Sequence, residues 1–212
     1  MRKDTRIVLA MDETDGGKAV RITDSVLNDI DAVKINWPLV LSAGPGIITD
    51  LSKKTDVICD FKVADIPNTV RLIVEGAVAR GASGVIVHAF TGEDSLLAAV
   101  EAAKGADIYA VTEMSHPGGK MFTALHAEEM ADLGVKCGVS GFIAPATRPD
   151  RIAAIRSRIG NRTILSPGVG AQGGSAYDAI KAGADYVIVG RSIYNSEDPG
   201  SAMKTLRREL ER

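Results

Sequence analysis

The sequence predicts a single (β/α)8 barrel, which we infer from the chain length, the number of short β-rich runs and the helical spacing between them. With 212 residues, 45% hydrophobic residues and a formal charge of −2, the chain suits one domain with a sizeable core over residues 1–212. Eight strands are expected, and they recur along the whole chain: 7–12, 32–35, 57–62, 84–89, 108–114, 141–145, 163–166 and 186–190.

The composition of these segments indicates parallel strands joined by helices. Continuous apolar runs such as residues 57–59 indicate strands that are buried on both faces, as in parallel sheets. The segment after residues 57–62 has apolar residues at helical spacing and ends at Gly81; its apolar positions are Val70, Ile73, Val74, Ala77 and Val78. A strand followed by a crossover helix, repeated eight times, is typical of the closed barrel.

A doubly wound open sheet is the alternative architecture. That fold usually has a Gly-rich phosphate-binding turn after its first strand. Here residues 12–15 read Asp-Glu-Thr-Asp, which is acidic. The barrel is therefore favoured.

Charge and targeting signals exclude several classes of protein. The pI near 5.9 and the lack of a basic run interleaved with aromatic residues argue against a nucleic-acid partner. The first residues run directly into a strand, with no apolar stretch of signal-peptide or membrane-spanning length. We therefore expect a cytoplasmic protein with no membrane partner and a small-molecule ligand.

Two carboxylates surround a lysine where the third strand ends. Asp60 and Lys62 lie two residues apart on a strand and so share a face, and Asp65 follows at the start of the next helix. The ordinary interpretation is a surface ion pair with Asp65 capping a helix that has Pro67 in its first turn. Because the carboxyl ends of barrel strands bear the active site, we favour a functional site.

The other strand ends add further polar groups to the same mouth of the barrel: Asp12, Lys34, His88, Ser115, Thr147 and Arg191. Ser115 has no base at a recognisable spacing, so we expect it to contact a heterocycle rather than act as a nucleophile. We interpret His88 and His116 as structural, and Trp37 as a packing or interface residue. Each aspartate of the third-strand cluster has a lysine to compete with a cation, so no metal is expected.

A phosphate-binding site is predicted from the last two strand ends. Residues 166–174, Ser-Pro-Gly-Val-Gly-Ala-Gln-Gly-Gly, follow the seventh strand, and Gly190 and Arg191 follow the eighth. Glycines let backbone amides approach an anion, and an arginine can pair with a dianion through two parallel hydrogen bonds. In this fold, phosphate commonly binds at these two loops.

Together these motifs resemble orotidine 5′-phosphate decarboxylase, and specifically its archaeal branch. The resemblance spans essentially the whole chain and rests on Asp60-x-Lys62-x-x-Asp65-Ile66-Pro67-x-Thr69, residues 33–35, residues 112–118, residues 166–174 and residues 189–194. It implies a homodimer with shared active sites that decarboxylates orotidine 5′-phosphate in pyrimidine biosynthesis without a metal or organic cofactor. Asn36 and Trp37 depart from the resemblance, since a small residue and a tyrosine are commoner there.

The resemblance also implies a role for each matching position. It makes Asp12 and Lys34 the ribose contacts, Asp60 and Lys62 the catalytic carboxylate and acid, and Ser115 the pyrimidine contact. The segment donated by the partner subunit corresponds to Asp65, Ile66 and Thr69. The phosphate contacts correspond to Gln172, Gly190 and Arg191, and the lid to the loop that begins at Pro167.

The chemistry expected of this set is stabilisation of a carbanion by a fixed cation. We expect Lys62 to stabilise the charge that develops at C6 of the pyrimidine and then to protonate it, within a network completed by Asp60, Asp65 and Lys34. Two alternatives stay open at this point. One is a Mg²⁺-dependent sugar-phosphate decarboxylase or aldolase of the same superfamily, and the other is a non-catalytic barrel that binds a phosphorylated ligand.

Overall fold

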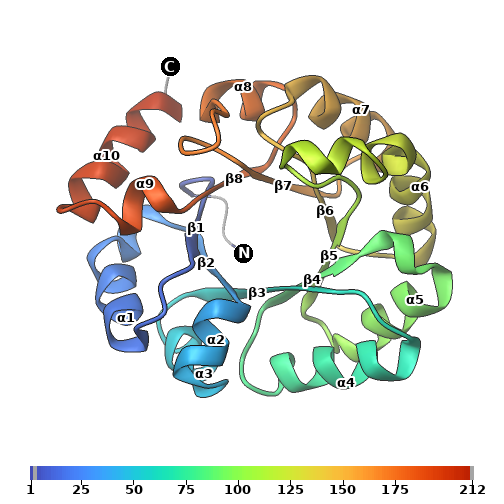
Figure 1. Cartoon of the computed structure of the whole chain (residues 1–212), viewed down its shortest axis with the longest axis horizontal. Coiled ribbons are helices and arrows are strands. Elements are labelled where there is room, and N and C mark those ends of the chain that lie inside the picture. Colours follow the sequence, from blue (N-terminus) through green and yellow to red (C-terminus); the bar gives the residue numbers. More distant parts are fainter. Residues whose placement is uncertain (2–3, 211–212) are drawn as a thin grey trace.

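Eight parallel strands close into a barrel in the order β1 to β8, with β8 pairing back onto β1 (Figure 1). The computed structural model describes residue 1 and residues 4–210 of the chain. The strands are β1 Ile7–Met11, β2 Ala32–Asn36, β3 Asp56–Val63, β4 Gly84–His88, β5 Asp107–Val111, β6 Gly141–Ile143, β7 Thr163–Pro167 and β8 Tyr186–Val189. The predicted barrel is confirmed.

Helices surround the barrel as an outer ring, which Figure 1 shows from one end. They are α1 Gly16–Ser25, α2 Trp37–Ala43, α3 Gly46–Ser52, α4 Pro67–Val78, α5 Glu93–Ala102, α6 Ala127–Cys137, α7 Pro149–Ile159, α8 Ala176–Lys181, α9 Arg191–Tyr194 and α10 Pro199–Leu210. Short 3-10 turns are η1 Leu27–Asp29, η2 Ala89–Thr91, η3 Pro117–Lys120 and η4 Thr123–His126. Within the described residues, no helix combines the length and apolar character needed to cross a membrane.

The core consists of two layers, which explains why the strands read as continuous apolar runs. Alternate strand residues such as Ile58, Ile86 and Tyr109 fill the inside of the barrel. The residues between them, such as Val57 and Val85, pack outward against the helices. Both faces of each strand are therefore buried, as expected for a parallel barrel.

The helix predicted after the third strand is confirmed as α4. It begins at Pro67 and buries Val70, Val74 and Ala77 against the barrel. Its N-cap is Ile66, and no side chain caps it; the Asp65 carboxylate instead accepts a hydrogen bond from the Ile66 amide at 2.7 Å. The capping interpretation of Asp65 is therefore wrong.

β5 and β6 end three and two residues earlier than the sequence predicts, whereas β1, β4 and β8 each end one residue earlier. β5 ends at Val111 rather than at residue 114, because the carbonyls of Met114 and Ser115 accept hydrogen bonds from Arg148 at 2.6 and 3.4 Å and so belong to the loop. The last residue of β6, Ile143, pairs with Val111. Once β5 has left the sheet, β6 loses this neighbour and also ends before residue 145.

The seam between β1 and β8 joins the first strand of the barrel to the last. Arg6 has a left-handed backbone, with φ 63°, and its guanidinium donates to the carbonyls of Ala184 and Asp185 at 2.8 and 3.1 Å. Its own carbonyl accepts from the Val187 amide at 3.0 Å. Backbone and side chain of one residue thus bind β8 to the start of β1.

Candidate active site

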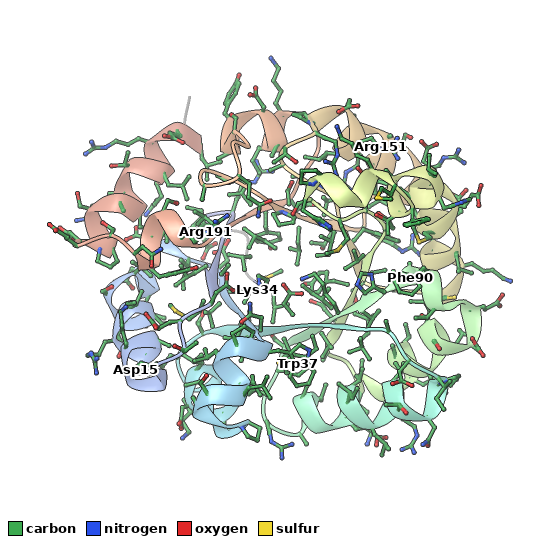
Figure 2. All side chains as sticks on the ribbon, in the orientation of Figure 1. Asp15, Lys34, Trp37, Phe90, Arg151 and Arg191 are labelled. Atoms are coloured by element: carbon green, nitrogen blue, oxygen red, sulfur yellow. The ribbon has the colours of Figure 1, made fainter. Side chains whose placement is uncertain are left out.

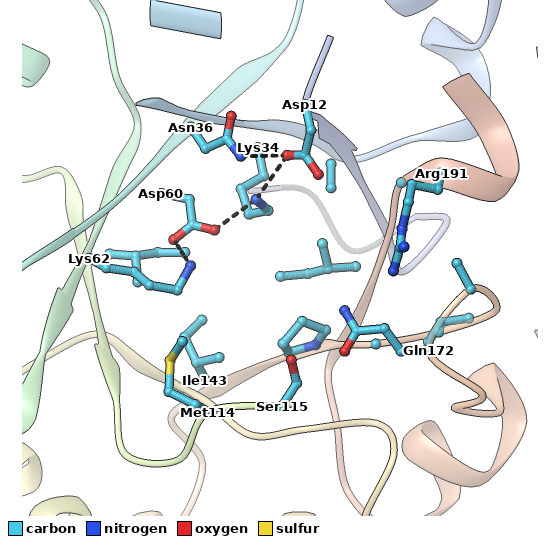
Figure 3. A pocket seen from close by; sticks show the side chains of 18 of the residues that line it. Asp12, Lys34, Asn36, Asp60, Lys62, Met114, Ser115, Ile143, Gln172 and Arg191 are labelled. Carbon is cyan, nitrogen blue, oxygen red and sulfur yellow. Dashed lines mark hydrogen bonds and ion pairs between the residues drawn. The ribbon is translucent and has the colours of Figure 1, made fainter. Parts of the chain in front are cut away.

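A cavity of about 240 Å³ opens at the carboxyl ends of the strands (Figure 3). Its lining comes from most of the barrel and includes Asp12, Lys34, Asn36, Asp60, Lys62, Ile86, Glu113, Met114, Ser115, Ile143, Pro167, Gln172, Ile188, Gly190 and Arg191. Figure 2 shows Lys34 and Arg191 toward the centre of the ring of helices and Asp15 toward its rim. The size suits a small molecule.

A row of alternating charges crosses one side of the cavity. Asp60 is only 8% exposed, and its two carboxylate oxygens are each taken by an ammonium group: Oδ2 accepts from Lys34 Nζ and Oδ1 from Lys62 Nζ, both at 2.7 Å. Lys34 is buried as well, whereas the Lys62 side chain is 37% exposed and reaches the open cavity. Both ammonium groups therefore border the cavity, with Lys62 the more exposed of the two.

Asp60 stays ionised because of its two neighbours. Burial by itself raises the pKa of this carboxyl, but the charges and hydrogen bonds of Lys34 and Lys62 outweigh burial, and the pKa lies below its ordinary value. Both oxygens are thereby occupied. In the described part of the chain, no three His, Cys, Asp or Glu side chains form a group that could hold a metal ion.

Lys62 reaches its position through an irregular backbone. Its φ is 44°, in the left-handed region, and the register between β3 and β4 shifts between Cys59 and Val63, which is the mark of a β-bulge. A non-glycine residue held in this region costs about 1–2 kcal/mol. The strand is thus distorted at the residue whose side chain enters the cavity.

Asp12 lies at the end of β1, on the other side of Lys34. Its Oδ1 accepts a hydrogen bond from Asn36 Nδ2 at 2.7 Å and lies 4.0 Å from Lys34 Nζ. The sequence assigned Asp12 and Lys34 to this site, and the structure brings them together. Asn36 was missed, because its polarity alone does not distinguish it from a helix cap.

The glycine-rich loop after β7 folds back on itself and closes through one isolated parallel bridge between Val169 and Gly174. Gly168, Gly170 and Gly173 all have positive φ, at 103°, 70° and 86°. The Gly170 amide donates to Gly174 O at 3.0 Å, and the Gly174 amide donates to Gly168 O at the same distance. Gln172 from this loop and Arg191 from the start of α9 both line the same side of the cavity (Figure 3).

The loop after β5 carries Ser115 and is fixed by a buried carboxylate that the sequence analysis missed. Glu113 is 1% exposed and accepts from Arg148 Nε and Arg151 Nε at 2.7 and 2.8 Å. Arg148 also holds the Met114 carbonyl, and the Met114 amide donates to Thr123 Oγ1 at 3.3 Å. The signal for Glu113 in the sequence was an acidic residue inside an otherwise apolar predicted strand.

The floor of the cavity is apolar and was also missed. Ile86, Ile143 and Ile188 point from β4, β6 and β8 into the barrel and line the cavity from below. The alternation of residues along each strand was the available signal, because every second residue of a barrel strand faces inward.

Three residues assigned to the site lie outside this cavity. Asp65 and Ile66 are exposed, Thr69 lies in the first turn of α4, and none of the three lines the cavity of the single chain. The Asp65 carbonyl accepts a hydrogen bond from Ser95 Oγ at 2.7 Å, which ties this segment to α5.

His88 and Trp37 have packing roles, as the sequence analysis expected. Burial of the His88 ring, with the nearby Lys62 charge adding to it and Asp60 opposing it, lowers the pKa of His88 to about 4. The rings of His88 and Phe90 pack together with their centroids 4.8 Å apart. Trp37 stacks on Phe61 with ring centroids 4.3 Å apart and donates its indole N–H to the Phe61 carbonyl at 3.0 Å.

Comparison of the sequence with protein families gives one match over residues 5–206, to the family described as Orotidine 5′-phosphate decarboxylase / HUMPS family. Curated relatives include the orotidine 5′-phosphate decarboxylase of Methanococcoides burtonii, 53% identical over 99% of both chains. That of Methanosarcina mazei is 50% identical over 100% of this chain and 97% of its own.

Solved structures give the same match in three dimensions. The enzyme of Methanocaldococcus jannaschii, complexed with the inhibitor BMP, superposes with a TM-score of 0.92 at 40% identity, covering 97% of this chain and 98% of its own. The enzyme of Pyrococcus horikoshii superposes with a TM-score of 0.90 at 45% identity, over 97% and 99% of the two chains.

Proposed function

From the premise that the chain belongs to the Orotidine 5′-phosphate decarboxylase / HUMPS family, we propose that it converts orotidine 5′-phosphate to UMP and CO2 through Lys62. The enzyme is a carboxy-lyase, as its relatives' names state. The observation that carries the mechanism is the Lys34–Asp60–Lys62 row, which fixes an ammonium group at the cavity wall.

The reaction places a localised charge at one carbon. The bond from C6 of the pyrimidine to the carboxylate breaks, CO2 departs, and the electron pair stays at C6 in the plane of the ring. The Lys62 ammonium stabilises this pair as it develops and then transfers one of its protons to C6. The neutral amine is reprotonated from solvent, so atoms and charges balance over the cycle.

The remaining charges keep Lys62 in position. Asp60 accepts a hydrogen bond from Lys62 and is itself anchored by Lys34, so the ammonium needs little reorganisation when charge develops at C6. Because each Asp60 oxygen already has an ammonium partner, the row supports a reaction without a bound metal. This favours an orotidine 5′-phosphate decarboxylase over a Mg²⁺-dependent sugar-phosphate lyase.

Binding of the phosphate is assigned to the opposite side of the cavity. Gln172, Gly190 and Arg191 line that side, and the loop that begins at Pro167 borders it. A dianion held by this loop uses remote binding energy to orient the reacting end of the substrate. Ser115 faces the pyrimidine, and Asp12 with Lys34 faces the ribose.

We assign Asp65, Ile66 and Thr69 to the site of a second copy of the chain, so that the functional unit is a homodimer. The support is an apolar surface on the loops after β3, β4 and β5, made of Ile66, Phe90, Met121, Phe122 and Leu125, each at least half exposed. It includes an apolar hollow of about 630 Å³ lined by Phe90, Phe122 and Met130 among others. Exposed apolar patches of this kind mark protein interfaces.

The test is a direct assay with the purified protein, following the absorbance change as orotidine 5′-phosphate becomes UMP. We expect turnover that is undiminished by EDTA. No turnover of orotidine 5′-phosphate would reject the proposed function, and activity abolished by EDTA and restored by Mg²⁺ would favour the sugar-phosphate lyase. Binding of UMP without turnover would leave a non-catalytic barrel.

A further inference from the structure

Asn36 occupies a position that normally caps a helix, yet its side chain is used elsewhere. It is the N-cap residue of α2, with an extended backbone at φ −131°, and asparagine is among the preferred residues there because its oxygen accepts from the helix amides. In this protein the side chain makes no capping hydrogen bond. Its Nδ2 donates to Asp12 Oδ1 at 2.7 Å instead.

The orientation of the Asn36 amide is fixed by chemistry. A carboxylate oxygen only accepts hydrogen bonds, so the group facing Asp12 is the amide nitrogen. The Asn36 oxygen is then left buried, with no hydrogen-bond partner among the described residues. An unpaired buried acceptor destabilises a fold, and this cost offsets part of what the hydrogen bond to Asp12 contributes.

The neighbouring residue holds the backbone that aims this amide. Trp37 stacks on Phe61 and donates to the Phe61 carbonyl, which ties the start of α2 to β3. Asn36 and Trp37 are also the two positions where the sequence departs from the family resemblance. Trp37 therefore anchors the backbone, and this backbone orients the Asn36 side chain toward Asp12.

The consequence falls on Asp12. Its Oδ1 is engaged by Asn36 and lies near Lys34, while its other oxygen points toward the middle of the cavity (Figure 3). We propose that Asn36 is a positioning residue that fixes the Asp12 carboxylate so that one oxygen accepts a sugar hydroxyl, which makes the site select ribose over deoxyribose. This proposal rests on the proposed function, which supplies the ribonucleotide.

The selectivity follows from what a missing hydroxyl leaves behind. An ionised carboxylate held in one orientation loses water when the ligand binds, and a hydroxyl replaces that water. A deoxy ligand leaves the same oxygen unpaired, which costs more than the lost hydrogen bond alone. A carboxylate that is free to rotate back toward solvent discriminates less.

The experiment measures dissociation constants of UMP and of its 2′-deoxy and 3′-deoxy analogues by calorimetry. We compare the wild type, Asn36→Ala and Asn161→Ala, a control that removes an exposed asparagine at the opposite end of the barrel. For Asn36→Ala we expect affinity for UMP to fall about tenfold, equivalent to ~1.4 kcal/mol. The analogue that lacks the hydroxyl contacted by Asp12 should weaken less than about twofold, so the ribose preference shrinks.

Thermal unfolding of the same variants separates positioning from structure. Asn36→Ala loses the hydrogen bond to Asp12 but also removes an unpaired buried acceptor, and no capping bond is lost, so its unfolding temperature should stay close to that of the wild type. Asn161→Ala should match the wild type in every affinity. Asn36→Asp, which places a second carboxylate against Asp12, should weaken UMP binding further.

An unchanged preference for ribose, seen as equal losses of affinity for all three ligands, would overturn the inference. That result leaves the proposed function intact if the wild type still binds UMP and turns over orotidine 5′-phosphate. A wild type that binds no UMP would reject the proposed function and this inference together.

Discussion

Lys62 donates a 2.7 Å hydrogen bond to Asp60 two residues earlier, from a backbone that is left-handed at φ 44°. In a regular strand, residues two apart lie on one face but point in parallel. The bulge between Cys59 and Val63 turns the lysine so that its ammonium meets the carboxylate at the cavity wall.

Substitution Lys62→Ala is expected to lower kcat by at least about 10⁴-fold, because it removes both the cation and the proton donor. Binding of UMP should persist at least in part, since the phosphate side of the cavity is untouched. The orotidylate absorbance assay measures the first effect and calorimetry the second. Lys104→Ala is the matched control, an exposed lysine that also has positive φ, 49°. Turnover close to the wild type in Lys62→Ala would remove Lys62 from its assigned role.

The strain at residue 62 predicts an unusual order of stability. Lys62→Gly and Lys62→Ala both lose the ammonium, but only glycine accepts a left-handed backbone without a steric penalty. The glycine variant should be more stable by about 1 kcal/mol, which is roughly 2–4 °C in unfolding temperature for a chain of this size. Lys104→Gly should likewise be more stable than Lys104→Ala. If the alanine variant at position 62 proved more stable, the left-handed conformation would be contradicted.

The assignment of Asp65 to a second subunit predicts complementation. Lys62→Ala and Asp65→Ala homodimers should each be nearly inactive. A mixed dimer, purified through two different tags, contains one site with both residues intact and should recover about half of the wild-type activity per dimer. Light scattering checks that the species is dimeric. Mixed dimers no more active than their parents would show that both residues act within one chain.

Arg191 is expected to act through the phosphate. Arg191→Ala removes two charge-assisted hydrogen bonds, so affinity for UMP should fall about 10²-fold to 10³-fold. Affinity for uridine, which lacks the phosphate, should stay unchanged. Arg80→Ala, an exposed arginine after α4, serves as the control. Equal UMP affinity in Arg191→Ala and in the wild type would refute the phosphate assignment.

His88 predicts a pH dependence of stability. Its pKa is about 4 in the folded protein and near 6.5 in the unfolded chain, so the unfolded state binds more protons between these values. The contribution of neutral His88 to the free energy of unfolding is fully present above about pH 6.5 and is lost as the pH falls toward 4. Because the ring is partly exposed and screened, we expect a loss of about 1–2 kcal/mol between pH 7 and pH 5.

Urea unfolding at the two pH values measures this loss. The His88→Gln variant, which does not titrate, should lose less stability than the wild type over the same interval. His126→Gln, at an exposed histidine of η4, should behave like the wild type. Identical pH dependence in all three proteins would rule out a neutral, partly buried His88.

The fold and the polar part of the site were predictable because both follow from patterns within short stretches of the sequence. Uninterrupted apolar strands need cover on both faces, and polar residues just after them in a barrel meet at one mouth, so Asp60, Lys62 and Arg191 were assigned before their distances were known. The left-handed Lys62 was not predictable, since its bulge arises from the register with β4. Asn36 was missed because its residue type suits a cap equally well.

The seam at Arg6 has a consequence for how the protein is made on the ribosome. Asp12 is synthesised directly after β1 and Arg191 only after β8, and they share a cavity only after β8 has docked on β1. A nascent chain that has emerged through β7 already carries both lysines and Asp60 but has no closed ring. The cavity is therefore completed only when β8, the last strand of the barrel, docks on β1.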